Sequence, residues 1–543
     1  MNWREKLEGF SRRDLFRGGG WAAALGMLPG GRALAAPTLS LGRDIYQSIG
    51  VRPMVNCKGT FTIVSGSQTL PEVKRAMEEA SRHYIQLDEL MEAVGRRLAE
   101  LTQAPFGIVT AGCAAALTHA TAACIAGADP EKMQRLPYLS GLKSEVIMPR
   151  SSRNVYDHAI RMLGVRIVEV DTKEQFVAAL SEKTAMVAIL AGPSDKFLEQ
   201  IAEPARQRGV PVLVDAAAEH MTIPNVHLQR GATMVAYSGG KCIRGPQCAG
   251  LLLGPKNLLW AAWLNSAPHH AFGRSLKVGK EEIMGMLAAV EMWVKRDHDG
   301  EKRTWESWLN HIGDRAKRVA TVRTEILQPE GLSNRSPRLR IAWDAAKVGI
   351  NGEQLEKLLY EGDPRIVIGG SSGGSSGGGR RGGGGGGNES SITIMPYMMI
   401  PGDEKIAAER IYQVLSKPPQ FPTTPEPAAP QTVGGQWDLH LEYVYGSSDH
   451  GLFLEQNGAA LTGTHQGDLL AGDLRGAVDG AKVQFRSSMR YEGTRLGYAF
   501  EGKLENGKLA GTVEMGEYGK GKWTAQRHQY GTPGGLVRPV KNV

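Results

Sequence analysis

The sequence predicts an α/β protein whose mostly parallel sheet is followed by a separate all-β module. Short apolar runs alternate with helical stretches between residues 105 and 254, which is typical of a parallel sheet covered by helices on both faces. A proline-rich stretch ends this pattern at 417–432, and the chain beyond it alternates between polar and apolar residues with a period of two. Such a change marks a domain boundary.

Seven short apolar runs are predicted to form the strands of the sheet. They lie at 108–109, 146–148, 165–168, 186–190, 212–214, 234–236 and 251–253, and helical stretches such as 173–180 and 195–208 separate most of them. Ligands of parallel sheets bind at the carboxyl ends of strands. The polar residues that follow these runs, Thr110, Asp215 and Ser238, are therefore the first candidates for a functional site.

The flanking residues extend this pattern into a large and a small domain. The large domain is predicted to cover 40–330, with an extended N-terminal segment and a helical region that includes a long helix at 280–298. A small α/β domain is predicted at 331–416, with strands near 338–343 and 391–395. Inside it, 369–387 contains only Gly, Ser and two Arg, so it is predicted to be a flexible insertion.

The residues after the stiff linker at 417–432 are predicted to form an all-β module at 433–530. Strand patterns begin near residue 437 and are separated by Asn457-Gly458, Asp479-Gly480 and Asn506-Gly507, which are strong signals for tight turns. The length fits a small antiparallel barrel or sandwich. No cluster of catalytic residue types is visible in it.

Lys241 is the strongest candidate for a catalytic residue. It ends the turn Ser238-Gly239-Gly240-Lys241, which follows one apolar strand, and the preceding strand ends in Asp215. A lysine can form a Schiff base with the aldehyde of pyridoxal 5'-phosphate, and an aspartate can keep the pyridine nitrogen protonated. Each feature alone also fits a solvated turn or an ordinary strand end, so the order of the two carries the prediction.

A candidate phosphate site precedes these two residues. A short strand ends at Thr110, and an alanine-rich helix runs from Gly112 and Cys113 to about residue 126. The free N–H groups of a helix N-terminus attract anions, although small residues here also fit close packing of a helix on a strand. Asp215 and Lys241 downstream favour the phosphate cradle, to which Ser238 can add a hydroxyl.

The N-terminal residues 1–35 are predicted to be a twin-arginine signal peptide. Arg12 and Arg13 precede a weakly apolar stretch at 18–28, and Ala33-Leu34-Ala35 offers a cleavage site. An ordinary basic helix is the alternative. The pathway carries folded proteins, so the sequence predicts a partner in the twin-arginine export machinery and a periplasmic location for an enzyme that already holds its cofactor.

Charge, hydropathy and cysteine content exclude several other classes of protein. The formal net charge of +8 is modest for 543 residues and is spread along the chain, so no nucleic-acid partner is predicted. No apolar run in the body reaches 20 residues, so no membrane span is expected in the mature chain. The five cysteines have no metal-ligand spacing, so we expect buried small residues and neither a metal site nor a disulfide framework.

Seven segments of the α/β part resemble the selenocysteine synthase-like group of fold-type I pyridoxal phosphate-dependent enzymes. Within this group they are most similar to proteins of the D-glucosaminate-6-phosphate ammonia lyase type. The segments are 52–60, 109–115, 153–159, Val214-Asp215-Ala216-Ala217-Ala218-Glu219, Ser238-Gly239-Gly240-Lys241, 277–283 and 362–366. The resemblance covers roughly 40–415 and is specific for the family more than for a substrate.

The resemblance implies roles for the residues already singled out. Lys241 would bind the cofactor aldehyde, Asp215 would pair with the pyridine nitrogen, and Gly112, Cys113 and Ser238 would contact the phosphate. A further catalytic candidate is His158, which either stacks on the cofactor ring or begins a helix as a structural residue.

The resemblance also implies a substrate-binding set of Arg365, Asn56 and Lys277. Arg365 lies in the region where this fold places an arginine for the substrate carboxylate, and a guanidinium fork suits that group, although a surface ion pair fits equally. Lys277 either reaches a phosphate, across the interface of a homodimer or higher homo-oligomer, or begins a solvated helix.

These observations predict an exported pyridoxal phosphate-dependent lyase that acts on an amino acid or amino sugar acid by α,β-elimination with release of ammonia. Export would separate it from charged tRNA, which argues against selenium transfer. A transferase, aldolase or racemase on the same scaffold is the alternative among enzymes. A binding protein that uses its C-terminal β-module without catalysis is the alternative from another class.

Overall fold

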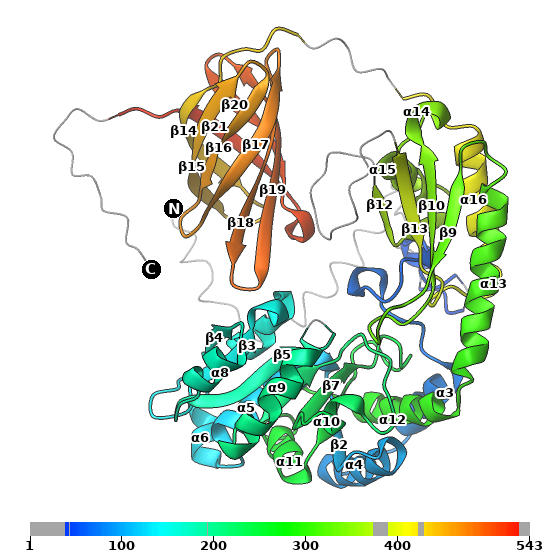
Figure 1. Cartoon of the computed structure of the whole chain (residues 1–543), viewed down its shortest axis with the longest axis vertical. Helices are drawn as coiled ribbons and strands as arrows, with labels where there is room; N and C mark the ends of the chain where they lie inside the picture. The colour runs from blue at the N-terminus through cyan, green and yellow to red at the C-terminus, as the bar shows by residue number, and fades with distance from the viewer. Residues whose placement is uncertain (1–38, 43, 193, 373–388, 422–427, 531–543) are drawn as a thin grey trace, which may run out of the picture.

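The computed structural model describes residues 39–42, 44–192, 194–372, 389–421 and 428–530, and Figure 1 shows that they form a large α/β domain, a small α/β domain and a β-barrel. The predicted signal peptide at 1–35 lies outside the described residues. So do most of the predicted insertion at 369–387 and part of the linker at 417–432.

The large domain is built on a seven-stranded sheet in which β8 is antiparallel to both of its neighbours and the other strands are parallel. This arrangement confirms the predicted mostly parallel sheet. In sheet order the strands are β2 (Phe106–Thr110), β8 (Gly250–Gly254), β7 (Met234–Ser238), β6 (Val212–Asp215), β5 (Thr184–Leu190), β3 (Glu145–Pro149) and β4 (Arg166–Val170).

The helices of the large domain cover this sheet with apolar residues. Helix α5 (Gly112–Ala126) is buried on nearly every side, because its alanines and threonines allow close packing against several strands. The others are α3 (Pro71–Ser81), α4 (Leu87–Thr102), α6 (Pro130–Arg135), α7 (His158–Arg161), α8 (Lys173–Ala179), α9 (Asp195–Gln207), α10 (Val226–Gln229), α11 (Lys256–Leu264) and α12 (Lys280–Lys295). Among the described residues, none of the helices is long and apolar enough to cross a bilayer.

The single helix predicted at 280–298 is two helices in the structure. Helix α12 ends at Lys295, and α13 (His298–Ala316) begins after two intervening residues. The side chain of Asp297 accepts a hydrogen bond from Gly300 N at 2.9 Å, so it acts as the N-cap of α13. This capping aspartate is the physical reason for the break.

The small domain contains a four-stranded sheet in the order β12 (Gly370–Ser372), β13 (Glu389–Ile394), β10 (Arg338–Asp344) and β9 (Arg323–Leu327). A separate parallel pair joins β1 (Met54–Cys57) to β11 (Arg365–Ile368). The remaining helices are α14 (Ala345–Val348), α15 (Gly352–Glu361) and α16 (Asp403–Ser416).

The core of the small domain takes in more of the chain than the predicted 331–416. Val55 and Cys57 of β1 and Leu309 and Ile312 of α13 lie in it. The N-terminal segment and α13 therefore belong to this core by packing. The first residues of the predicted insertion also differ from expectation, because β12 pairs with β13 there.

The C-terminal module is a closed antiparallel barrel of eight strands, which resolves the predicted choice between barrel and sandwich. The strands are β14 (Gly435–Glu442), β15 (Ser447–Asn457), β16 (Ala460–Gln466), β17 (Ala471–Asp479), β18 (Lys482–Tyr491), β19 (Thr494–Glu505), β20 (Lys508–Glu514) and β21 (Lys520–Arg527). The predicted turns at Gly458, Gly480 and Asn506-Gly507 connect neighbouring strands. Its core is separate from the other two cores.

All five cysteines are free. Cys57 and Cys113 are buried, and Cys124 and Cys242 are half-buried, in agreement with the expectation of small core residues. Cys248 is exposed and departs from it.

A chain of hydrogen bonds runs through the interior of the barrel. It joins the side chains of Tyr443, Ser448, His450, His465 and Ser487 in that order. His450 Nδ1 lies 2.8 Å from His465 Nε2, and His465 Nδ1 lies 2.7 Å from Ser487 Oγ. Burial lowers the pKa of His465 from 6.5 to about 3, so this imidazole is neutral in the folded barrel.

We predict that the barrel loses stability as the pH falls below 6.5. The unfolded chain then binds a proton at His465, whereas the folded barrel does not until about pH 3. Calorimetry should show a barrel transition that falls by several degrees in this window, and the dependence should flatten in a His465→Gln variant. His440→Gln, at a more exposed histidine that pairs with Asp449, is the control and should leave the dependence unchanged.

Candidate active site

The candidate site lies where β2, β6 and β7 end at the same edge of the sheet. Strands β6 and β7 are parallel neighbours, with Asp215 opposite Ala236, so Asp215 and the turn after β7 meet there. Gly250 of the antiparallel β8 lies between Thr110 and Ser238 in register. A Cβ on Gly250 would lie 2.4 Å from the carbonyl carbon of Gly112, so glycine is required for this close approach.

Asp215 is held in place by two donors. Its Oδ1 accepts hydrogen bonds from Ala217 N at 3.1 Å and from the Cys113 thiol at 3.6 Å. Burial raises the pKa of Asp215, and the hydrogen bond from Ala217 N and the positive charge of Lys241 partly oppose that rise. The carboxyl is therefore suited to share a proton with a basic ring nitrogen beside it.

Lys241 is presented by a tight turn. Gly239 N donates to Ala249 O at 2.8 Å, and Arg244 N donates to Lys241 O at 3.0 Å. A Cβ on Gly240 would lie 2.7 Å from Gln247 Cα, so the turn packs too closely for a side chain there. In the described part of the chain the amine makes no ion pair, and it lies 5.9 Å from the centre of the Tyr156 ring.

The N-terminus of α5 fits the phosphate of the cofactor. Gly112 has a φ of +86°, and no atom lies within 4 Å of the place where a Cβ would stand, so this end of the fifteen-residue helix is open beside its first residue. The Cys113 thiol points to Asp215, and burial raises its pKa well above the ordinary value. A phosphate contact from Cys113 would therefore come from its N–H group. The donors present thus fit pyridoxal 5'-phosphate.

The aromatic side chain that faces Lys241 is Tyr156, which the sequence reasoning did not single out. It lies in the 3₁₀ turn Val155–Asp157, directly before α7. His158 is the first residue of α7 and is exposed, which matches the structural alternative for it. Stacking of His158 on the cofactor ring stays a prediction. An aromatic residue within the family-like segment 153–159 was the available signal for Tyr156.

The structure does not bring the three predicted substrate residues into contact with Lys241. Asn56 Oδ1 accepts from the N–H groups of Lys58 and Gly59 at 3.0 and 2.9 Å, so its side chain shapes its own loop. The Arg365 guanidinium lies 4.7 Å from the ring centre of Tyr360 and donates to its carbonyl.

Lys277, the third of these residues, is exposed just before α12. Asn56 and Arg365 belong to the β1–β11 pair of the small domain, whereas Lys241 belongs to the large domain. The substrate roles of all three residues stay predictions.

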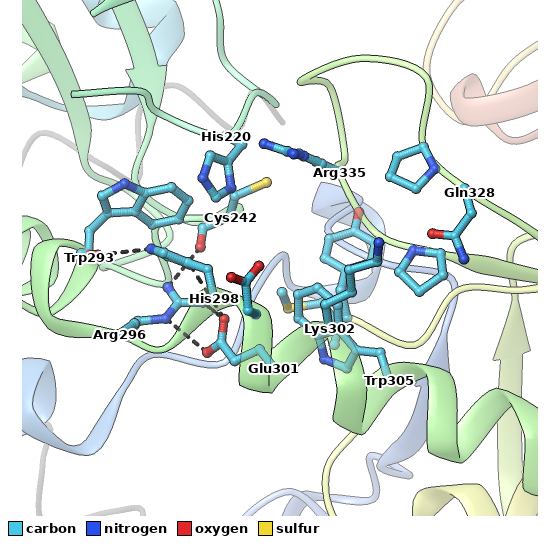
Figure 2. Close-up of a pocket in the computed structure, with 15 residues that line it drawn as sticks. His220, Cys242, Trp293, Arg296, His298, Glu301, Lys302, Trp305, Gln328 and Arg335 are labelled. Atoms are coloured by element: carbon cyan, nitrogen blue, oxygen red, sulfur yellow. Dashed lines mark hydrogen bonds and ion pairs between the residues drawn. The ribbon is translucent and has the colours of Figure 1, made fainter. Parts of the chain in front are cut away.

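A cavity of about 320 Å³ lies between the large and small domains, next to the Lys241 turn (Figure 2). Cys242 lines it from that turn, and His220 lines it from the loop after β6. The other lining residues are mostly aromatic or charged: Trp293, Arg296, His298, Asp299, Glu301, Lys302, Trp305, Arg335 and Tyr397. No local sequence pattern pointed to it, because its walls come from segments far apart in the chain.

The two arginines that line this cavity differ in whether an acidic partner neutralises their charge. The charge of Arg296 is neutralised by Glu301, to which it donates two hydrogen bonds at 2.8 and 2.9 Å. It donates a third to the Cys242 carbonyl. Although burial acts in the opposite direction, the bonds from His298 and Arg296 lower the pKa of Glu301 to about 2. Arg335 extends toward His220 and makes no ion pair among the described residues, so its charge is available to an anion.

No family model matches this chain. It is 29% identical over 334 residues to D-glucosaminate-6-phosphate ammonia lyase of Salmonella typhimurium, which covers 59% of this chain and 88% of the relative. It is 28% identical over 340 residues to 5'-C-glycyluridine monooxygenase-decarboxylase of a Streptomyces species, over 60% of this chain and 83% of the relative.

Two further comparisons concern the selenocysteine synthase-like group and the fold. An L-seryl-tRNA(Sec) selenium transferase of Proteus mirabilis is 25% identical over 207 residues, which cover 33% of this chain and 43% of that relative. The solved structure of D-glucosaminate-6-phosphate ammonia-lyase superposes with a TM-score of 0.58 at 25% identity, over 69% of this chain and 99% of that one. These likenesses confirm the predicted resemblance, the fold-type I α/β fold, and an enzyme that uses pyridoxal phosphate.

We predict that Asp215→Asn retains the cofactor but slows proton exchange at the α-carbon of a bound amino acid by about 100-fold or more. A neutral amide cannot hold the proton on the ring nitrogen, so the ring withdraws electrons less strongly. Deuterium incorporation followed by NMR measures this rate. Asp171→Asn, at an exposed position after β4, is the control, and an unchanged rate in Asp215→Asn would contradict the assignment.

Proposed function

We propose that this protein is a pyridoxal phosphate-dependent lyase that releases ammonia from an amino sugar acid or a similar amino acid. The observation that carries the proposal is the meeting of Asp215, Lys241 and the N-terminus of α5 at one edge of the sheet. The relative named D-glucosaminate-6-phosphate ammonia lyase supports the reaction class.

Each residue of the site has a separate role toward the cofactor and the substrate. When bound, the cofactor withdraws electrons from the α-carbon of an amino acid joined to its aldehyde carbon. The Lys241 amine would hold the aldehyde of the cofactor and, when free, would take the proton from the α-carbon of the substrate. Asp215 would keep a proton on the ring nitrogen, and the amides at Gly112 and Cys113 would hold the phosphate together with Ser238. Loss of a β-substituent and hydrolysis then yield ammonia and a keto acid.

The cavity between the domains supports a substrate with a charged far end. Arg335 and Lys302 bring positive charge to it, and Trp293 and Trp305 are among its aromatic lining residues. A phosphate or carboxylate at the end of a sugar acid is an anion of suitable size and charge. We assign this cavity to that end of the substrate.

A second candidate function for the same site is oxidative decarboxylation of an amino acid, in place of ammonia release. The observation in its favour is the relative named 5'-C-glycyluridine monooxygenase-decarboxylase, which is nearly as similar as the lyase. The two reactions give different products, namely ammonia with a keto acid in one case and carbon dioxide with oxygen uptake in the other. A purely non-catalytic binding role is disfavoured, since Asp215 and Lys241 follow two neighbouring parallel strands at the same edge of the sheet.

We predict that the purified enzyme releases ammonia from D-glucosaminate 6-phosphate or another member of a panel of amino sugar acids and D- and L-amino acids. Lys241→Ala should abolish the Schiff-base absorbance and lower ammonia release by about 10⁴-fold or more, because the base is lost. Lys256→Ala, an exposed lysine that pairs with Glu92, is the control. Carbon dioxide release with oxygen uptake, in place of ammonia, would overturn the lyase assignment.

We also propose that the chain is exported to the periplasm by the twin-arginine machinery. The proposal rests on Arg12 and Arg13, the weakly apolar stretch at 18–28 and Ala33-Leu34-Ala35. An enzyme that must close around its cofactor has a physical reason to cross the membrane folded.

We predict that replacing Arg12 and Arg13 with Lys traps the protein in the cytoplasm with its cofactor bound. Cell fractionation measures the distribution, and Arg4→Lys, outside the paired arginines, should still be exported. Recovery of the double variant from the periplasm in normal amounts would count against this pathway.

We further propose a homodimer or a higher homo-oligomer. The exposed position of Lys277 supports it, since a phosphate of a neighbouring subunit's site could be reached from there. The mass in solution, measured by analytical ultracentrifugation, tests this proposal, and a monomer at working concentration would exclude it.

A further inference from the structure

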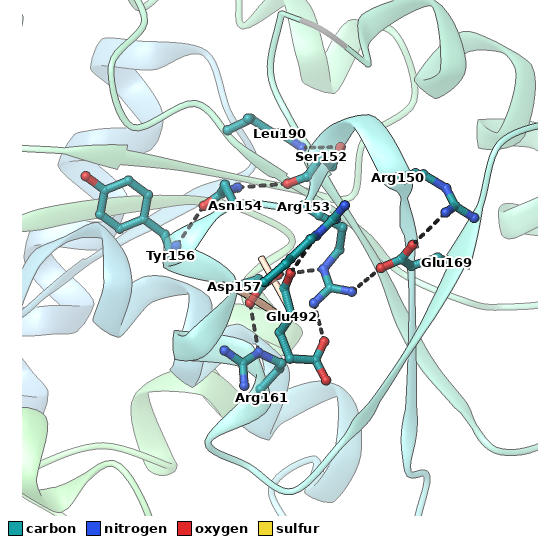
Figure 3. A network of polar contacts seen from close by, with 11 residues as sticks. Arg150, Ser152, Arg153, Asn154, Tyr156, Asp157, Arg161, Glu169, Leu190 and Glu492 are labelled. Carbon is teal, nitrogen blue, oxygen red and sulfur yellow. Dashed lines mark hydrogen bonds and ion pairs between the residues drawn. The ribbon is translucent and has the colours of Figure 1, made fainter. Parts of the chain in front are cut away.

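The buried side chain of Arg153 joins the large domain to the barrel (Figure 3). The side chain is 3% exposed, and each of the three guanidinium nitrogens has an acidic partner. Nε donates to Asp157 at 2.6 Å, one terminal nitrogen pairs with Glu169, and the other pairs with Glu492 of the turn between β18 and β19. A buried guanidinium nitrogen without a partner is costly, so the contact from the barrel completes this network.

The glycine beside Glu492 shows that the same turn fits closely against the large domain. A Cβ on Gly493 would lie 2.2 Å from the carbonyl oxygen of Asn154 and 2.7 Å from Asp157 Oδ2. Gly493 does not have a left-handed φ, so the turn itself would accept a side chain there. The contact with the large domain, and not the geometry of the hairpin, is what requires glycine at this position.

The part of the large domain that receives this turn borders the candidate active site. Tyr156, whose ring faces the Lys241 amine, lies between the two residues that Gly493 approaches, Asn154 and Asp157. Asn154 also shapes the turn, because its Oδ1 accepts from Tyr156 N at 2.8 Å. Asn154 and Asp157 line a small cavity together with Asp215. The barrel thus contacts the residues on both sides of Tyr156.

A second contact extends the same surface. Asp157, which is fully buried, also accepts from Arg161 Nε at 2.8 Å, and the Arg161 guanidinium lies 5.9 Å from the ring centre of Tyr491. Figure 1 shows the β18–β19 hairpin extending from the barrel toward the large domain.

We propose that the tip of the β18–β19 hairpin, residues 491–494, is a docking element that holds the active-site segment 153–161 in its ordered conformation. The barrel then positions Tyr156 and the neighbouring part of the candidate cofactor site. The hairpin tip therefore docks on a segment of the same chain. The ion pair of Glu492 with Arg153 and the close fit of Gly493 hold the two together. The inference rests on the geometry of the site and is independent of which reaction the site performs.

The test uses two variants of the full chain that change only the docking turn. Gly493→Leu introduces a side chain that the turn accepts and the large domain does not, and Glu492→Ala removes the acidic partner of Arg153. Glu505→Ala, an exposed glutamate at the end of β19 next to another turn, is the matched control. Hydrogen–deuterium exchange of peptides within 150–163 is measured with and without cofactor, and binding of pyridoxal phosphate is titrated by fluorescence.

The proposal expects exchange in the segment 153–161 to rise at least about fivefold in Gly493→Leu and by a smaller factor in Glu492→Ala. Cofactor affinity should weaken by about threefold or more, while exchange in the barrel strands stays as in the parent protein. Raised salt should speed exchange in the parent more than in Glu492→Ala, because it screens the ion pair. Parent-like exchange in Gly493→Leu, or an equal rise in Glu505→Ala, would overturn the proposal.

Discussion

The parallel pairing of β6 with β7 is the constraint on which the candidate site depends. It places a carboxyl that burial favours in its protonated form beside the turn that presents Lys241, and the antiparallel β8 between β7 and β2 brings the N-terminus of α5 to the same edge. Gly250 and Gly240 allow these backbones to approach within contact distance. The three groups needed for an aldehyde, a ring nitrogen and a phosphate therefore meet through the hydrogen bonds of one sheet.

The sheet and its site were predictable because their signals are local. Near-continuous apolar runs marked the strands. Asp215 stood out as an acid directly after one such run, and Lys241 as the end of the short glycine-containing turn after the next. The break at Asp297 and the placement of β1 in the small domain were not predictable in the same way. A capping aspartate inside a helical pattern is a weak signal, and the pairing of Met54 with Arg365 joins residues that lie far apart in the chain.

The parts of the site that escaped prediction share this non-local origin. The cavity beside Cys242 exists because the segment that carries Arg335 lies next to the loop with His220, where Leu332 O accepts a hydrogen bond from His220 N at 2.9 Å. Tyr156 faces Lys241 because its turn follows a strand end of the same sheet. The role of Glu492 in the barrel has no sequence signal, since no local pattern relates it to a buried arginine of another domain.

The β18 strand links the interior of the barrel to the active-site segment. Ser487 of this strand is hydrogen-bonded to the neutral His465, and the strand continues to Tyr491 and the docking turn. Because the buried His465 takes up a proton only when the barrel opens, acid conditions destabilise the same barrel whose β18–β19 hairpin supplies Glu492 as a partner of Arg153. A barrel that loosens at low pH would therefore also release Tyr156, which couples the order of the active site to the protonation state of a residue in a separate core.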